Sequence, residues 1–354
     1  MEKIRYGIIG SGMMGCEHLM NIRLMDDAEV GAIADPNETS RSWGRSFAGD
    51  AVPIHSDYHE VLRDPTIDAV VVSTPNYTHF NVLEDVFRSG KHVLVEKPLC
   101  TRVEDCLRVI ERAEHYPGVV WVGMEYRYMR AVGRLIEEAR AEAVGRLWML
   151  AIREHRFPFL PKVGDWNRFN RNTGGTLVEK CCHFFDLMNL ILARRPLRVY
   201  ASGGRDVNHL DEVYDGEVPD IIDNAYTIVD YEGGARAMLD LCMFAEGSRH
   251  EVEIAATGER GKIEAFEPAD ELVISYRNGA PRVQVQCEVD PNVRHAGAHH
   301  GSTYFEHRAF LDAIRDGRPA SVTVRDGALA VAVGAAAERS IALGRPVDLA
   351  ELGF

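Results

Sequence analysis

The feature that most constrains the fold of this chain is an apolar strand that leads directly into a glycine loop and then into a helix. Residues 4–9 form a short run rich in isoleucine, as expected for a strand buried on both faces of a sheet. The run ends in the sequence GSGMMG at positions 10–15, and apolar residues then recur every three positions from Leu19 to Met25. A buried strand, a G-x-G-x-x-G turn and a helix in this order indicate the first unit of a dinucleotide-binding domain.

Each glycine of this loop has its own physical reason. Gly10 permits the tight turn, Gly12 lets the backbone approach a pyrophosphate, and Gly15 allows the helix to lie close to the strand. The helix N-terminus would then face the anion. The alternative is a glycine turn without a ligand, because the pattern alone is a weak signal.

Asp35 lies 20 residues after the loop, at the end of the second apolar run. Its carboxylate can accept hydrogen bonds from the adenosine ribose hydroxyls. A 2′-phosphate would bring a second negative group beside this carboxylate, so NAD is favoured over NADP. Arg41 and Arg45, on the following helix, can soften that repulsion.

Strands and helices alternate as far as residue 124. Further apolar runs at 30–34, 69–73, 92–95 and 119–122 are separated by stretches of helical character. This alternation predicts parallel β-α-β units. We therefore expect residues 1–124 to form an α/β Rossmann domain with a doubly wound sheet, whose ligand lies at the carboxyl ends of the strands.

Two polar segments follow strands at the ligand-binding end of this sheet. Thr74-Pro75-Asn76, with His79, follows the run at 69–73, and Glu96-Lys97-Pro98 follows the run at 92–95. Lys97 is well placed to stabilise the alkoxide that develops when a substrate hydroxyl is oxidised. The alternative is a surface lysine paired with Glu96, and position alone does not decide between the two.

After residue 124 the alternation stops. Helices are predicted over 127–144 and 176–192, with a polar and aromatic loop over 158–172. Runs of strand character extend from 197 to 288 and are separated by tight turns. We expect residues 125–354 to form an α+β domain with a mainly antiparallel, open-faced sheet.

Glu179, His183 and Asp186 share one face of the helix predicted over 176–192, because they are spaced i, i+4 and i+7. A carboxylate one turn from a histidine can orient the imidazole and raise its basicity. A neutral His183 can then take a hydroxyl proton as hydride leaves the carbon. The alternative is a helix face held by an ion pair.

These residues together resemble the Gfo/Idh/MocA family of glucose–fructose oxidoreductases, inositol dehydrogenases and rhizopine-catabolism proteins. The family pattern joins the glycine loop, a T-P-N-x-x-H stretch, E-K-P and a G-G-x-x-x-D-x-x-x-H-x-x-D helix. Gly174-Gly175, His183 and Asp186 match the last motif, and the stretch 310–319 also resembles the family. The resemblance spans nearly the whole chain, and E-K-P and the histidine helix are its most specific parts.

The chain departs from the family pattern within the histidine helix. Glu179 replaces the usual aspartate, so a carboxylate is kept on a side chain that is one methylene longer. Lys180-Cys181-Cys182 stand where small or apolar residues are more usual. A Cys–His nucleophile pair is disfavoured, because adjacent helix residues point about 100° apart.

The resemblance implies an NAD-dependent dehydrogenase that transfers hydride between nicotinamide and a secondary alcohol of a sugar, an inositol or a related polyol. The implied catalytic residues are His183 as the base, Lys97 as the group that polarises the oxygen and Glu179 as the group that orients them. Lys97 and His183 can exchange roles. The alternatives are an NAD-using glycosidase and a non-catalytic sugar or dinucleotide sensor, although retention of Lys97 and His183 argues against a sensor.

Further residues are assigned to the two binding sites. The predicted cofactor-binding residues are Gly10, Ser11, Gly12, Met13, Met14, Gly15, Asp35, Thr74, Pro75, Asn76, His79, Glu96, Lys97 and Arg127. The predicted substrate-binding residues are Lys97, Tyr126, Arg156, Trp166, Asn167, Arg168, Glu179, His183 and His300. No metal site is predicted, because the histidines at 295, 299 and 300 lack a matching cysteine or aspartate spacing.

Composition limits the partners of the chain. The 40 Lys and Arg against 54 Asp and Glu give a net charge of −14, which disfavours nucleic acid and anionic membranes.

The apolar run at 328–337 is shorter than a membrane helix, and a strand begins too early to leave room for a signal peptide. Seven cysteines without a C-x-x-C pair predict reduced thiols. We expect a cytoplasmic protein, and the resemblance implies a homodimer or homotetramer formed through the open sheet face.

Overall fold

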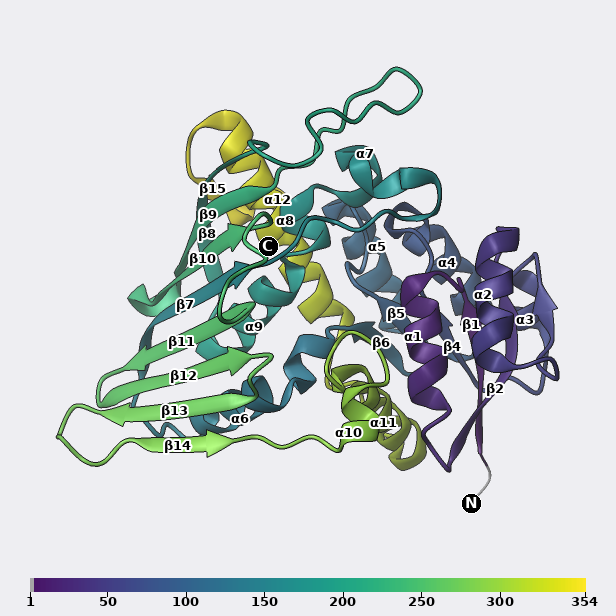
Figure 1. Cartoon of the computed structure of the whole chain (residues 1–354), viewed down its shortest axis with the longest axis horizontal. Coiled ribbons are helices and arrows are strands. Elements are labelled where there is room, and N and C mark those ends of the chain that lie inside the picture. The colour runs from purple at the N-terminus through teal and green to yellow at the C-terminus, as the bar shows by residue number, and fades with distance from the viewer. Residues whose placement is uncertain (1–2) are drawn as a thin grey trace. The chain divides into compact units, whose positions relative to one another are not determined.

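The computed structural model describes residues 3–354, which divide into two compact units whose elements are labelled in Figure 1. Unit 1 comprises residues 3–125, Lys162–Gly164 and Asp290–Ala328. Unit 2 comprises Tyr126–Pro161, Asp165–Val289 and Leu329–Phe354. The segment Asp290–Ala328 therefore groups with the start of the chain, which local sequence patterns do not indicate.

Unit 1 contains a six-stranded parallel sheet in the order β3-β2-β1-β4-β5-β6. The chain order reverses between β1 and β4, which is the switch point where such sheets bind ligands. The predicted Rossmann fold is confirmed. The strands are β1 (Ile4–Ile9), β2 (Ala28–Ala34), β3 (Ile54–His55), β4 (Ala69–Val72), β5 (His92–Glu96) and β6 (Val120–Gly123). The helices are α1 (Met13–Ile22), α2 (Glu38–Ala48), α3 (His59–Arg63), η1 (Asn76–Thr78), α4 (His79–Ser89), α5 (Val103–Ala113), α10 (Pro291–Arg294) and α11 (Ser302–Asp316).

The central strands of this sheet are fully buried. Every side chain from Ala69 to Val72 and from Val93 to Val95 has 0% exposure. These near-continuous apolar runs suit a sheet that helices cover on both faces. Because β4 and β5 are parallel neighbours, the segments that follow them emerge at the same edge of the sheet.

Unit 2 is built on a nine-stranded sheet in the order β14-β13-β12-β11-β7-β10-β9-β8-β15. Only β7 and β10 pair in parallel, so the predicted, mainly antiparallel sheet is confirmed. Buried and exposed residues alternate along β9, which leaves one face of the sheet open. The strands are β7 (Leu147–His155), β8 (Pro196–Gly204), β9 (Asn224–Tyr231), β10 (Arg236–Cys242), β11 (Val252–Gly258), β12 (Gly261–Glu267), β13 (Glu271–Tyr276), β14 (Val283–Gln286) and β15 (Val347–Asp348).

The helices α6 and α9 of unit 2 lie on the other face of its sheet, where α6 contacts β12 and α9 contacts β7 (Figure 1). They are α6 (Arg130–Arg140), α7 (Asn170–Thr173), α8 (Thr176–Glu179) and α9 (Cys182–Leu192), with short turns η4 (Glu232–Gly234) and η5 (Leu349–Leu352). Three elements cross a unit boundary: η2 (Glu125–Tyr128), η3 (Val163–Arg168) and α12 (Val324–Leu343).

Two helix predictions are wrong in their bounds. The helix predicted over 176–192 is interrupted: α8 ends at Glu179 and α9 begins at Cys182. Lys180 lies at the interruption, and its ammonium group turns inward to a buried carboxylate of β7. The helix predicted over 127–144 begins only at Arg130, after the tighter turn η2. At Lys180, a buried ion pair accompanies the interruption of the predicted helix.

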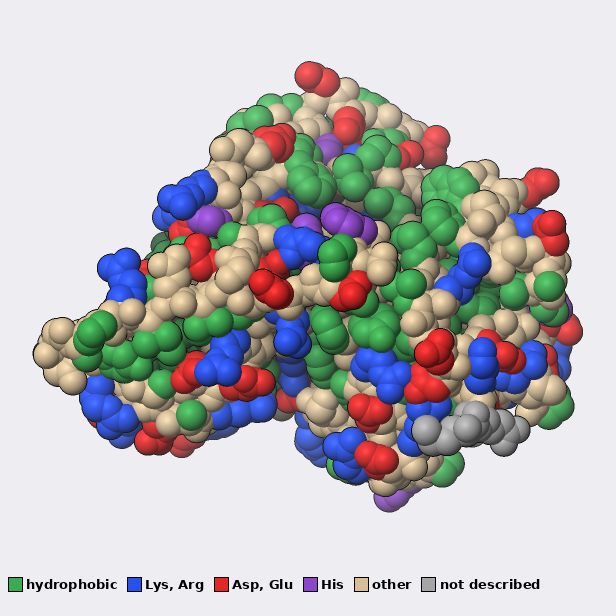
Figure 2. Space-filling view, turned by 60° about the horizontal axis from the view of Figure 1, so that its bottom comes forward, with side chains coloured by type: hydrophobic (Ala, Val, Ile, Leu, Met, Phe, Trp, Pro, Cys, Tyr) green, Lys and Arg blue, Asp and Glu red, His purple; other side chains and the backbone are tan. Residues whose placement is uncertain are grey.

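The apolar helices and the surface charges of the structure bear on membranes and on charged partners. No helix within residues 3–354 has the length and apolar character needed to cross a membrane. On the face shown in Figure 2, acidic and basic side chains are intermixed.

Candidate active site

The glycine loop has the conformation that its sequence predicts. Gly10 has a φ of +94°, and a Cβ there would lie 2.6 Å from the carbonyl oxygen of Ser73. A Cβ at Gly15 would overlap the carbonyl oxygen of Gly10. At Gly12, the N-cap of α1, a Cβ would meet nothing within 4 Å, and no side chain caps the helix. The loop therefore leaves open space beside a helix N-terminus, where a pyrophosphate can approach.

Asp35 lies at the carboxyl end of β2 with 8% exposure. Its Oδ2 accepts a hydrogen bond from Ser11 N, and its Oδ1 accepts one from Asn37 N, both at 2.8 Å. These two bonds fix the carboxylate beside the glycine loop. A carboxylate has about four acceptor positions, so capacity remains for ribose hydroxyls.

The segment after β4 presents a buried amide. Within residues 3–354, Asn76 Nδ2 is a buried atom that has no hydrogen-bond partner. Nearby, the fully buried His79 ring joins two strand-end segments, with Nδ1 2.8 Å from Pro98 O and Nε2 3.0 Å from Thr74 O. Asn76 is therefore available to a ligand, whereas His79 holds the loop after β4 to the loop after β5.

Glu96 occupies the carboxyl end of β5, directly before Lys97, and its carboxylate is bound inside unit 1. Its Oε1 is 2.9 Å from His18 Nε2, and His18 Nδ1 is 2.9 Å from His307 Nε2. Burial favours a raised pKa for Glu96, but the hydrogen bond and charge of His18 outweigh burial and lower it. Sequence reasoning missed His18 and His307, because 289 residues separate them and neither carries a periodic signal.

His299 belongs to a second buried cluster of unit 1. Its Nδ1 is 2.8 Å from Glu17 Oε1, and its Nε2 is 3.6 Å from Glu125 Oε1. Burial raises the pKa of Glu125 to about 7, against the opposing charge of His299. His299 thus bridges two carboxylates, and no group of three or more metal-binding side chains occurs among the described residues. His300, the predicted substrate contact, is partly exposed beside it.

The proposed base lies in unit 2, at the start of α9. His183 is 2% exposed, and its ring stacks on Tyr126 with centroids 4.2 Å apart and planes 7° from parallel. Asp186, one turn later, pairs with Arg127 through two hydrogen bonds of 2.6 and 2.5 Å. Arg127 and Asp186 therefore neutralise each other beside the imidazole.

Glu179 lies at the end of α8 and is 6% exposed. This short helix is held in place by a glutamate of α12. Glu338 Oε1 accepts a hydrogen bond from Leu177 N at 2.9 Å. Gly175 has a φ of +99°, and its missing Cβ makes room for the Glu338 carboxyl group. Burial raises the pKa of Glu338 to about 7, although the bond to Leu177 opposes the shift. The Gly174-Gly175 motif therefore has a packing reason in addition to any functional one.

The predicted substrate residues of the loop at 158–172 differ in accessibility. Asn167 is 0% exposed and donates from Nδ2 to Leu160 O at 3.1 Å. Arg168 is 2% exposed and pairs with Glu212 at 2.8 Å. Trp166 and Arg156 are only partly buried. Asn167 therefore holds the loop internally, and Arg168 holds it to the segment between β8 and β9. Polarity alone does not reveal this distinction.

Cys181 and Cys182 are both fully buried beside His183. Burial raises the pKa of the Cys181 thiol well above its usual value. The Cys182 Sγ lies 3.5 Å from Glu179 O. The raised pKa of Cys181 disfavours the thiolate that nucleophilic catalysis requires.

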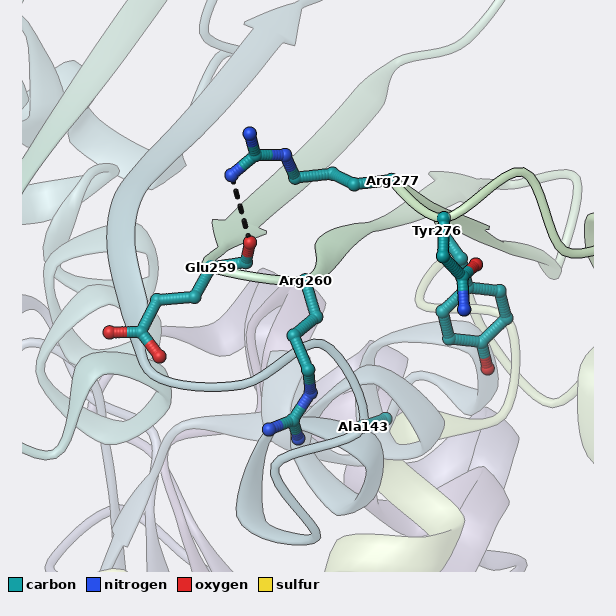
Figure 3. Close-up of a pocket in the computed structure, with 6 residues that line it drawn as sticks. Ala143, Glu259, Arg260, Tyr276 and Arg277 are labelled. Carbon is teal, nitrogen blue, oxygen red and sulfur yellow. Dashed lines mark hydrogen bonds between the residues drawn. The ribbon is translucent and has the colours of Figure 1, made fainter.

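A pocket elsewhere in unit 2 contains none of the predicted site residues (Figure 3). Arg277 crosses it to donate a hydrogen bond to Glu259 O at 3.0 Å. The residues that line it come from the segment before β7, the turn between β11 and β12 and the end of β13 with the turn that follows: Ala143, Glu259, Arg260, Tyr276, Arg277 and Asn278.

Comparisons with known proteins agree with this architecture from end to end. Residues 4–124 match the family model described as the NAD-binding Rossmann fold of an oxidoreductase family, and residues 137–349 match the model of its C-terminal alpha/beta domain, GFO_IDH_MocA_C. The chain is 27% identical over 353 residues to myo-inositol 2-dehydrogenase of Thermotoga maritima, with 99% of each chain covered. It is 28% identical over 349 residues to inositol 2-dehydrogenase 2 of Saccharopolyspora erythraea, covering 97% of this chain and 95% of the relative. The crystal structure of a probable dehydrogenase from Thermotoga maritima has a TM-score of 0.80 and 27% identity, covering 98% of this chain and 99% of that one.

Proposed function

Since the chain belongs to the Gfo/Idh/MocA family of oxidoreductases, we propose that it transfers hydride between NAD and a secondary alcohol of an inositol, a sugar or a related polyol. The observation that carries this proposal is the end-to-end similarity to proteins named inositol 2-dehydrogenases. An inositol is accordingly the first substrate class to test.

The residues of unit 1 suit NAD. Gly12 leaves open space at an uncapped helix N-terminus, Asp35 is fixed with acceptor capacity to spare, and the buried Nδ2 of Asn76 can donate to a ligand oxygen. Together these groups can bind a pyrophosphate, a ribose and an amide or carbonyl group. Bound NAD would supply the acceptor for the substrate's hydride.

In the proposed mechanism, His183 removes the hydroxyl proton and Lys97 stabilises the negative charge that develops on the substrate oxygen. One turn after His183, the Asp186 carboxylate is paired with Arg127 through two hydrogen bonds. Glu179 is proposed to orient these groups from the end of α8. Tyr126, Arg156, Trp166 and His300 are proposed to bind substrate hydroxyls.

A panel of inositols, sugars and polyols, assayed with NAD and with NADP at 340 nm, tests this function. We expect sustained NADH formation with at least one cyclic polyol and a higher kcat/KM with NAD than with NADP, because Asp35 is positioned to repel a 2′-phosphate.

Two other outcomes would contradict the dehydrogenase proposal. Release of an aglycone without lasting absorbance at 340 nm would indicate an NAD-using glycosidase. Nucleotide binding without turnover of any panel compound would indicate a sensor.

We also propose that a second copy of the chain covers the open face of the sheet. Tyr200 on β8, Ile228 on β9 and Met238 on β10 are direct neighbours in register and are 43%, 48% and 38% exposed. An apolar row of this kind across adjacent strands is typical of a protein interface. We expect analytical ultracentrifugation to show a dimer or tetramer. Ile228→Asp should shift the equilibrium toward the monomer. An unchanged molecular mass in this variant would place the interface elsewhere.

The cytoplasm is the proposed location. The seven cysteines are thiols rather than disulfides, and five of them are buried. Reduced thiols are usual in a compartment where glutathione and thioredoxin keep cysteines reduced.

A further inference from the structure

Lys180 is a charged residue buried within the segment that supplies the proposed base. It stands where the family pattern usually has a small or apolar residue, and it is 5% exposed. Burying an ammonium group costs free energy unless charges and hydrogen bonds compensate for the lost water. The contacts of Lys180 therefore indicate what it does.

The ammonium group has two close partners in unit 2. Lys180 Nζ is 2.8 Å from Glu154 Oε1 and donates to the hydroxyl oxygen of Tyr126 at 2.7 Å. It also lies 4.8 Å from the centre of the Tyr126 ring. Glu154 is 0% exposed, and its Oε1 is shared with Arg156 at 3.5 Å. Lys180 thus ties β7 to the Tyr126 ring.

Tyr126 connects this ion pair to His183. Its ring also stacks on the imidazole of His183, at a centroid distance of 4.2 Å. We propose that Lys180 is a positioning residue for His183: the Lys180–Glu154 pair, acting through Tyr126, holds the imidazole in place and in its uncharged form. This inference rests on the proposed role of His183 as the base.

The charged groups that face His183 come from every element packed against it. α9 itself contributes Asp186, which is paired with Arg127 of η2. The buried residues of α6 are apolar. The remaining charged groups are Glu179 at the end of α8, Lys180 in the turn that follows, Glu154 on β7 and Arg156 directly after β7. Lys180 and Glu154 have opposite charges, so removing Lys180 makes the surroundings of His183 more negative, although Arg156 still contacts Glu154, and removing Glu154 makes them more positive.

This arrangement predicts shifts of opposite sign. Lys180→Met removes a positive charge from the surroundings of the imidazole, which stabilises imidazolium. Glu154→Gln removes a negative charge, which destabilises imidazolium. We expect the midpoint of the His183 titration to move up by about one pH unit in the first variant and down by a similar amount in the second. The double variant should titrate near the wild-type midpoint.

The experiment is an NMR titration of the imidazole signals in the intact, substrate-free chain, with His183 assigned by comparison with His183→Asn. Lys180→Arg keeps the charge and should titrate like the wild type. Lys262→Met, which removes a 42%-exposed lysine paired with Glu264 on the sheet, is the matched control and should leave the midpoint unchanged. The acid limb of the kcat/KM profile should move with each NMR midpoint.

Shifts of the same sign in both single variants, or no shift in either, would overturn the inference, because a purely structural role does not depend on the sign of the charge removed. If Lys180→Met does not fold, Glu154→Gln should still lower the midpoint of the His183 titration. The double variant should return that midpoint to the wild-type value. The titration needs no substrate. A substrate panel without turnover would therefore reject the proposed function, but it would not change how the His183 titration is interpreted.

Discussion

Replacing Lys97 with alanine is expected to lower kcat by about 10²- to 10⁴-fold while the affinity for NAD stays nearly unchanged. The ammonium group interacts more strongly with a developing alkoxide than with a neutral hydroxyl, so its loss raises the barrier more than it weakens binding. The strand end that carries Lys97 is fixed separately, because Glu96 is held by His18 at 2.9 Å. Initial rates at 340 nm and NAD titration by calorimetry measure the two quantities.

Two further variants separate charge from packing in this experiment. Lys97→Arg keeps a cation and should retain more turnover than Lys97→Ala. Lys262→Ala removes a partly exposed lysine that pairs with its sheet neighbour Glu264, and it should leave kcat and the melting temperature unchanged. Wild-type turnover in Lys97→Ala would show that the proposed mechanism is wrong.

The fold of unit 1 could be predicted because its signals are local. The buried strands are continuous apolar runs such as Ala69–Val72, and each ends in a glycine, proline or polar segment. The return of Asp290–Ala328 to this unit had no such signal. That segment joins α1 through side chains, for example Glu17 with His299 and His18 with His307, and such pairs depend on distance in space rather than on spacing in sequence.

The candidate site was predictable in its motifs but not in its internal contacts. The spacing of Glu179 and His183 suggests one continuous helical face, yet the helix is interrupted where Lys180 turns to Glu154. A buried ion pair outweighs periodicity here, because leaving either charge unpaired would cost more than breaking one turn of helix. Likewise, Arg168 is a plausible sugar contact by type, but it pairs with Glu212, which lies in the segment between β8 and β9.

Replacing His183 with asparagine is expected to lower kcat by about 10²- to 10⁴-fold and to remove the acid limb of the pH profile. In the wild type, kcat/KM should rise with pH as the base loses its proton, and then level off. Asparagine can fill much of the space beside the Tyr126 ring, but it cannot accept the hydroxyl proton. Rates measured at 340 nm across a pH series, with melting temperatures as a folding control, provide the test.

The same pH series decides which of the two residues is the base. If His183 takes the proton, Lys97→Ala should be slow at every pH but keep the acid limb, whereas His183→Asn should lose it. If Lys97 takes the proton, the pattern reverses, because the limb follows whichever group must be uncharged. A primary isotope effect with substrate deuterated at the carbinol carbon should increase in both variants, since weaker activation of the hydroxyl makes hydride transfer limit the rate. An acid limb that survives in both variants would assign proton removal to neither residue.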